Sequence, residues 1–215
     1  MAILPVGIGP QEGGYQIERS LRFNSADSAY LSRTPASAGS LTTWTYSTWV
    51  KRAALGAWQR LIHASSSGLV QTHLSFASND TIWLEVYNDP TDYKINTTQV
   101  FRDVGAWYHI VAVYDSNNAT SSDRMRLYVN GARITALSTA IYPSSGYSGL
   151  INSTSTHNIG RRLDNTSEYL SAYLSETHLI DGSALDPTSF GEYNSDTGVW
   201  QPKAYTGSYG TTAIS

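Results

Sequence analysis

The sequence predicts an all-β protein, built as a single antiparallel β-sandwich with an extended N-terminal arm and an irregular C-terminal tail. Two observations predict this class. Short segments of alternating apolar and polar residues follow one another along the 215 residues, separated by polar turns about 8–12 residues apart, which is typical of a sandwich. Ala, Leu, Glu and Lys, the residues of long amphipathic helices, dominate no window of the chain.

The first 16 residues predict an arm and not part of a core. Pro5, Pro10 and four glycines break any regular pattern in this stretch, and proline is incompatible with a helix interior. The apolar residues of the arm are Ile3, Leu4, Val6 and Ile8. Because isolated tails are normally polar, we expect these four side chains to pack on a neighbouring subunit as an assembly contact.

Three later stretches have the clearest strand patterns: residues 43–52, 81–88 and 107–115. The first two alternate between an apolar and a more polar face, as strands with one buried face do. The centre of the third, residues 110–113 (IVAV), is apolar on both faces, which indicates a strand in the middle of a sandwich. Further short strands are expected at residues 20–23, 29–32, 58–64, 72–77, 93–98, 124–129, 132–137, 157–161 and 169–181.

Two turns join strands into predicted hairpins. Residues 88–92 (NDPTD) are strong turn formers and connect the strand at 81–88 to its expected partner at 93–98. Asn130-Gly131 predicts a type I′ turn, because that turn needs a positive φ at both central residues.

The chain divides into three expected parts: an arm (1–16), a sandwich domain (17–186) and a C-terminal extension (187–215). Asp186 followed by Pro187 can cap one helical turn running to Tyr193, since proline fits the first helical position. The residues from Gly198 onward have no regular pattern.

Composition excludes several function classes. The absence of cysteine excludes disulfide frameworks, thiol catalysis and Cys-ligated zinc. The net charge is −3 and no basic run exceeds two residues, so a nucleic-acid partner is not expected. No apolar run approaches the roughly 20 residues of a membrane span.

Four segments carry a family likeness. In chain order they are residues 46–51 (YSTWVK), 107–115 (WYHIVAVYD), 126–131 (RLYVNG) and 173–182 (YLSETHLIDG). Their order and spacing resemble those of laminin G-like, concanavalin A-like jelly rolls, and the resemblance covers about residues 20–186. It implies a single jelly-roll sandwich.

Segments near both ends resemble laminin G-like proteins of tailed bacteriophages. These segments are residues 20–24 (SLRFN), 30–33 (YLSR), 190–192 (FGE), 197–203 (TGVWQPK) and 205–210 (YTGSYG). The resemblance implies a non-catalytic virion protein that decorates the capsid or belongs to the tail. Its expected partners are other virion subunits, including further copies of itself on the particle. The alternative function is that of an adhesin that binds host or environmental glycans.

Glycoside hydrolases share this fold, so a third function is hydrolysis. The chain lacks the Glu-x-Asp-x-x-Glu strand that places two catalytic carboxylates about 5–5.5 Å apart in retaining enzymes. Glu85 and Glu176 are isolated carboxylates on separate predicted strands. The Gly-x-Ser-x-Gly and His-Glu-x-x-His motifs are also missing, so we expect no enzyme activity.

The strand at residues 81–88 supplies the candidate ligand site. If its aliphatic face is buried, Trp83 and Tyr87 point outward with Glu85 between them. Aromatic rings beside a carboxylate can stack on the C–H face of a sugar and accept its hydroxyl groups. The alternative is that a loop or a neighbouring subunit covers these rings, since Tyr and Trp are common interface anchors.

Metal and cofactor sites are weakly indicated. The five histidines lie on five different predicted segments, and no pair has the spacing of metal ligands on one strand face. Asp115, Asn117 and Asp123 flank a polar loop that could supply oxygen ligands to calcium. The alternative for this loop is a solvated turn, and no other cofactor is expected.

Overall fold

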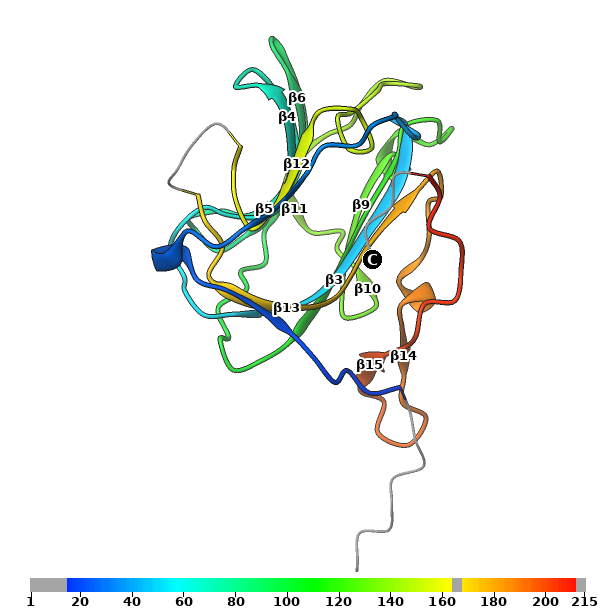
Figure 1. Cartoon of the computed structure of the whole chain (residues 1–215). Helices are drawn as coiled ribbons and strands as arrows, with labels where there is room; N and C mark the ends of the chain where they lie inside the picture. The colour runs from blue at the N-terminus through cyan, green and yellow to red at the C-terminus, as the bar shows by residue number, and fades with distance from the viewer. Residues whose placement is uncertain (1–14, 164–167, 212–215) are drawn as a thin grey trace, which may run out of the picture.

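The structure is a computed structural model that describes residues 15–163 and 168–211, and it confirms the predicted fold class. Two large antiparallel sheets pack face to face, and a two-stranded sheet lies beside them (Figure 1). The six-stranded sheet consists, in spatial order, of β1 (Leu21–Phe23), β13 (Ala172–Asp181), β3 (Thr43–Arg52), β8 (Tyr108–Asp115), β9 (Met125–Val129) and β10 (Ala132–Arg133). The seven-stranded sheet consists of β11 (Leu137–Ile141), β7 (Thr91–Thr97), β6 (Ile82–Asn88), β5 (Val70–Phe76), β4 (Gln59–Ser67), β12 (Thr156–Ile159) and β2 (Leu31–Arg33).

The remaining elements are short. The two-stranded sheet pairs β14 (Gly191–Tyr193) with β15 (Trp200–Pro202). Three 3-10 helices of three residues each are η1 (Ser25–Asp27), η2 (Ser121–Asp123) and η3 (Pro187–Ser189). Within the described residues no helix has the length and apolar character that crossing a membrane requires.

The main core fills the space between the two large sheets. Alternate residues of each strand point into it, because successive side chains of a strand face opposite sides. Trp44 and Tyr46 of β3 meet Leu74 of β5 and Leu84 of β6 there, and all four side chains are fully buried.

Both predicted hairpin turns are present. Asn88 pairs with Thr91, so β6 returns directly as β7. Asn130 and Gly131 have φ values of 50° and 80°, as a type I′ turn requires, and they join β9 to β10.

The expected strand at residues 132–137 is instead two strands on different sheets. β10 ends at Arg133 on the six-stranded sheet, and the chain then crosses to the seven-stranded sheet, where β11 pairs with β7. Such a crossing depends on tertiary packing, so a local alternation pattern does not reveal it.

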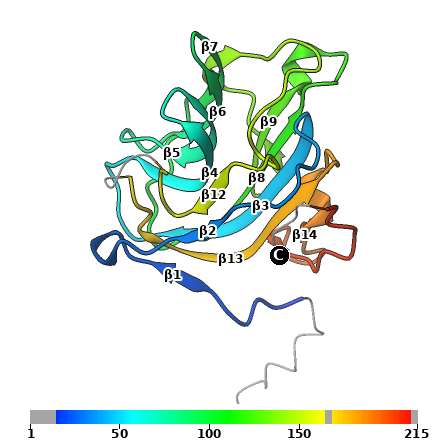
Figure 2. The same cartoon turned by 45° about the horizontal axis from the view of Figure 1, so that its top comes forward.

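The C-terminal extension is more ordered than the sequence indicates, because it covers the outer face of the six-stranded sheet (Figure 2). Val111 and Val113 of β8 point to this outer face, where Ile180 and Phe190 bury them in a second apolar cluster. Their burial therefore comes from the extension, and the seven-stranded sheet covers the other face of β8.

A buried histidine anchors this cover. His109 of β8 stacks between Trp49 and Trp200, with ring centroids 4.9 and 5.8 Å away. The Trp200 indole N–H donates to His109 Nδ1 at 3.0 Å, while Nε2 lies 2.9 Å from Ser47 Oγ. Burial lowers the pKa of His109 to about 3, so the ring is neutral and accepts the indole proton at neutral pH.

Candidate functional site

The outer face of the seven-stranded sheet carries the candidate site that the sequence predicts on β6. The aliphatic residues of β6 are buried in the core, and Trp83, Glu85 and Tyr87 alternate with them and face outward, partly exposed. The predicted direction of these three side chains is therefore correct.

Glu85 is the centre of a hydrogen-bond network with the neighbouring strand. His73 of β5 stands directly opposite Glu85, and its Nε2 lies 2.8 Å from the carboxylate. Burial lowers the pKa of His73 well below its usual value, so a neutral imidazole donates its Nε2 proton to Glu85. Burial also raises the pKa of Glu85, although the nearby Lys94 ammonium opposes that rise.

The same network extends to a serine but does not form a usable nucleophile. Ser75 Oγ lies 3.0 Å from His73 Nδ1, and Arg60 donates to the same oxygen at 3.0 Å. The order Glu85–His73–Ser75 thus resembles an acid–base–nucleophile relay. However, Ser75 has no exposed surface, so the hydroxyl is closed to a substrate and the relay holds the face rigid.

Two tryptophans form the aromatic part of this surface. Trp58, which precedes β4, meets Trp83 edge-to-face with ring centroids 5.4 Å apart. Arg60 lies 5.3 Å over the Trp58 ring, and Lys94 lies 5.3 Å over the Trp83 ring. We call the surface formed by Trp58, Arg60, His73, Trp83, Glu85 and Lys94 the two-tryptophan face.

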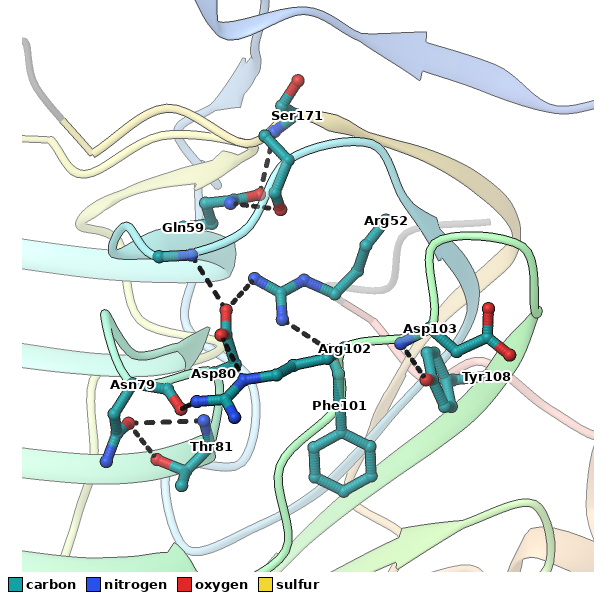
Figure 3. Close-up of polar contacts among 12 residues, drawn as sticks. Arg52, Gln59, Asn79, Asp80, Thr81, Phe101, Arg102, Asp103, Tyr108 and Ser171 are labelled. Carbon is teal, nitrogen blue, oxygen red and sulfur yellow. Dashed lines mark hydrogen bonds and ion pairs between the residues drawn. The ribbon is translucent and has the colours of Figure 1, made fainter.

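A buried ion pair holds the loop that presents Trp58. Figure 3 shows the Asp80 carboxylate between the guanidinium groups of Arg52 and Arg102, at N–O distances of 3.0 and 2.9 Å. The same carboxylate accepts the Gly56 N–H at 2.9 Å, two residues before Trp58. Asp80 thereby connects β3, the turn before β6 and the loop that leads to Trp58.

Charge and burial have opposite effects on the pKa of Asp80. Burial alone would raise the pKa of Asp80, but hydrogen bonds from Gly56 and Arg102 and the charge of Arg52 outweigh it and lower the pKa. Asp80 is therefore ionised at neutral pH and compensates the fully buried Arg52.

A second group of ion pairs borders the face beside β4. Glu168 accepts from Arg60 and from Arg162, the latter at 3.2 Å. Asn158 of β12, which stands opposite His63 of β4, is buried, and neither of its amide atoms has a hydrogen-bond partner within the described part of the chain. The indole Nε1 of Trp83 is also buried and has no hydrogen-bond partner within the described residues.

Tyr87 does not join the network around Glu85. It lies at the hairpin end of β6, where its hydroxyl donates to Asp89 at 3.2 Å. The site predicted from three residues is therefore centred on Trp83 and Glu85.

The candidate calcium residues each have a different partner. Asp123 pairs with Arg133 at 2.6 Å, and the Asn117 amide donates to Thr42 at 3.0 Å. Asp115 accepts from Asn118 at 3.3 Å. Across the described ranges, no group of three or more His, Asp or Glu side chains is arranged to hold a metal. We assign no calcium site to this loop, since each candidate side chain contacts a different partner and the three do not point to a common centre.

The assembly residues predicted in the arm, Ile3, Leu4, Val6 and Ile8, lie outside the described residues.

A family model described as the concanavalin A-like lectin/glucanases superfamily matches residues 24–189, which is most of the chain. The chain belongs to this superfamily. Comparison with curated proteins gives no significant match.

Solved structures share the superfamily fold at low sequence identity. A heptameric SAP-like pentraxin from Limulus polyphemus is 17% identical with a TM-score of 0.52, over 86% of this chain and 87% of that one. A putative carbohydrate binding protein from Bacteroides ovatus is 14% identical with a TM-score of 0.54, over 81% of this chain and 46% of that one. Domain 4 of an extracellular arabinanase from Geobacillus stearothermophilus, in complex with arabinotriose, is 15% identical with a TM-score of 0.51, over 71% of this chain and 65% of that one. This chain thus spans less than two thirds of the length of two of these three, and the likeness shows the fold alone.

Sequence reasoning missed most of the two-tryptophan face. Lys94 was missed because the sequence predicts a turn over residues 88–92, whereas the observed turn has two residues and pairs Asn88 with Thr91, which sets Glu85 opposite Lys94. Trp58 and His73 could not be found either, since the first reaches the face from a loop and the second depends on the β5–β6 register.

Proposed function

We propose that this superfamily member is a non-catalytic carbohydrate-binding protein that binds glycans on the two-tryptophan face. The observation that carries the proposal is the pair of partly exposed indoles, Trp58 and Trp83. Beside them lie Glu85, which is hydrogen-bonded to His73, and Lys94, whose ammonium is 4.0 Å from the Glu85 carboxylate. On the opposite sheet, the C-terminal extension covers the centre of the outer face.

The chemistry of the face suits a sugar. The C–H side of a pyranose or furanose ring packs on an indole, which supplies a large and rigid apolar surface. A neighbouring hydroxyl can donate to the Glu85 carboxylate, and another can accept from the Lys94 ammonium, which has three donor protons. The His73–Glu85 hydrogen bond fixes the carboxylate before a ligand arrives, so less conformational entropy is lost on binding.

The names of two solved structures support the same class of ligand. One is described as a putative carbohydrate binding protein, and the other is an arabinanase domain in complex with arabinotriose. Neither is similar enough in sequence to carry its binding residues to this chain, so the proposal depends on the residues of the face.

The virion role remains a proposal based on the sequence resemblance alone. It places this chain on a tailed-phage particle, in contact with other virion subunits through Ile3, Leu4, Val6 and Ile8 and in several copies. Glycan binding is compatible with that location, since an adhesin on a particle needs both an anchor and an outward binding face. We place glycan binding first because described residues support it.

Replacing Trp83 by alanine tests the proposal. We expect W83A to weaken binding to the glycan that the wild type selects on an array by at least about tenfold, or about 1.4 kcal/mol, because the stacking surface is removed. Trp107→Ala is the matched control, since Trp107 is an exposed tryptophan directly before β8 of the other sheet. Calorimetric titration measures the affinity, and thermal melting checks that both variants fold. Equal binding by W83A and wild type, or a loss confined to W107A, would contradict the proposed location.

A further inference from the structure

We propose that the glycan bound on the two-tryptophan face is neutral, and that the face discriminates against sugars bearing a carboxylate. This inference depends on the proposed function and adds the substrate class to it. It comes from the way the charged groups of the face are paired with one another.

Every described cation of the face already has a carboxylate partner. Lys94 pairs with Asp92 and lies 4.0 Å from Glu85. On the β4 side, Arg60 and Arg162 share Glu168. Three cations and three carboxylates therefore compensate one another, and His73 is neutral because burial lowers its pKa well below the usual value.

An acidic sugar would disturb this arrangement. Its carboxylate would have to compete for the Lys94 ammonium with Asp92, whose side chain is the most exposed of the six charged groups at 30%. Glu85 and Asp92 would remain close to the bound anion, and such a like-charge contact is a strong element of discrimination.

Three neutral groups on or beside the face are buried and have no hydrogen-bond partner within the described residues: the indole N–H of Trp83, the side-chain carbonyl of Asn96 and the amide of Asn158. Single atoms of the ion-paired groups, among them Arg60 Nε, Arg162 Nε and Asp92 Oδ1, also have no hydrogen-bond partner there, but the charges of these groups are already compensated. A hydroxyl group both donates and accepts, so it can satisfy an amide carbonyl as well as an N–H. A carboxylate only accepts, and it would leave the carbonyl groups unsatisfied.

The experiment compares two matched sets of short glycans on the purified full-length chain. The neutral set is arabinotriose, cellotriose and lactose, and the acidic set is trigalacturonate and sialyllactose. We expect one or more neutral glycans to bind, and the acidic ones to bind at least about tenfold more weakly. Binding of the neutral glycan should change little between 50 and 500 mM salt, because no net charge is neutralised.

A variant that removes one carboxylate from the face should increase its affinity for an acidic glycan. Asp92→Asn leaves Lys94 with a single, more distant carboxylate, so we expect the affinity for trigalacturonate to rise by about fivefold or more, as roughly one ion pair is worth. Asp196→Asn, in the exposed loop between β14 and β15, removes the same charge elsewhere and should leave both affinities unchanged.

The outcomes separate the two proposals. Tighter binding of an acidic glycan by the wild type on the same face, abolished by W83A, overturns the neutral class and leaves the proposed function standing. An absence of binding to every glycan in both sets and on a broad array overturns the proposed function itself. A selective gain for trigalacturonate in D92N alone supports the inference.

Discussion

At the scale of single residues, the Asp80 carboxylate combines ion pairs with a backbone hydrogen bond. It accepts from two arginines and from a backbone N–H, and it links three segments that are distant in sequence (Figure 3). Arg52, its partner, is almost fully buried, and Phe76 lies 4.2 Å below the guanidinium group. Removal of the carboxylate would therefore leave a charge inside the protein without compensation.

Asp80→Asn tests this arrangement. We expect it to lower the free energy of unfolding by about 3–5 kcal/mol, because breaking a buried pair leaves the remaining ion uncompensated. Urea unfolding at pH 7 measures the change. Asp103→Asn is the matched control, since Asp103 is exposed and mainly accepts from Gly105, and it should change stability by less than about 0.5 kcal/mol. Equal losses in the two variants would refute the role given to Asp80.

Residue-level prediction from sequence succeeded where the answer depended on strand alternation. Trp83 and Glu85 face outward because Ile82 and Leu84 face the core, and that pattern is local. Ionic partners such as Arg60 with Glu168 come from segments about a hundred residues apart and depend on the fold. No local pattern encodes such a pair.

At the scale of elements, the C-terminal extension shows how a short segment can complete a sandwich. Trp200 of β15 lies across Gly131 and Gly191, where an added Cβ would come within 2.5 Å of the indole. Its ring also stacks on His109 and donates to it. The β14–β15 hairpin is therefore attached to β8 through one aromatic side chain and the two glycines that make room for it.

Trp200→Ala tests the attachment of this hairpin. We expect a loss of about 3–5 kcal/mol in the free energy of unfolding, which is typical of large aromatic side chains removed from a packed site. Val199→Ala is the control, because the adjacent Val199 is 61% exposed and should contribute little. Differential scanning calorimetry measures both. An unchanged melting temperature for W200A would mean that the hairpin is not held by this contact.

The sequence predicts the elements of this fold unevenly, for a physical reason. Strands β3, β6 and β8 and the two hairpin turns follow from alternation and turn chemistry, which act over a few residues. β11 and the β14–β15 hairpin were missed, because the first follows a change of sheet and the second gains its stability from the sheet beneath it. One helical turn after Asp186 was predicted to run to Tyr193, but it ends at Ser189, and β14 begins at Gly191.

At the scale of the whole molecule, buried histidines make stability depend on pH. Burial lowers the pKa of His73, His109, His157 and His178 in the folded state. In the unfolded chain each titrates near 6.5, so the unfolded state binds more protons below that pH. Stability is therefore complete above about pH 6.5 and falls as the pH is lowered.

We expect each of these histidines to remove up to about 1.4 kcal/mol of stability per pH unit below 6.5, and for His109 the loss continues to about pH 3. Glu85, whose pKa is raised on folding, opposes the trend. Urea unfolding at half-unit steps from pH 8 to 4.5 measures the slope, and His109→Phe should have a shallower one. A stability that is flat between pH 7 and 5 would contradict this prediction.

The covered outer face of the six-stranded sheet also determines how the molecule can be attached to a surface. Residues 17–20 line a cavity with Trp49 and Trp107 on that sheet. Near the other end of the described chain, Thr211 donates to the carboxylate of Asp181, the last residue of β13 in the same sheet. Both ends of the described chain thus emerge on the same side, opposite the two-tryptophan face (Figure 2). A tether at either end would hold the protein by its covered side and leave the other sheet pointing outward. Display on a bead, a cell or a particle therefore requires no reorientation of the domain.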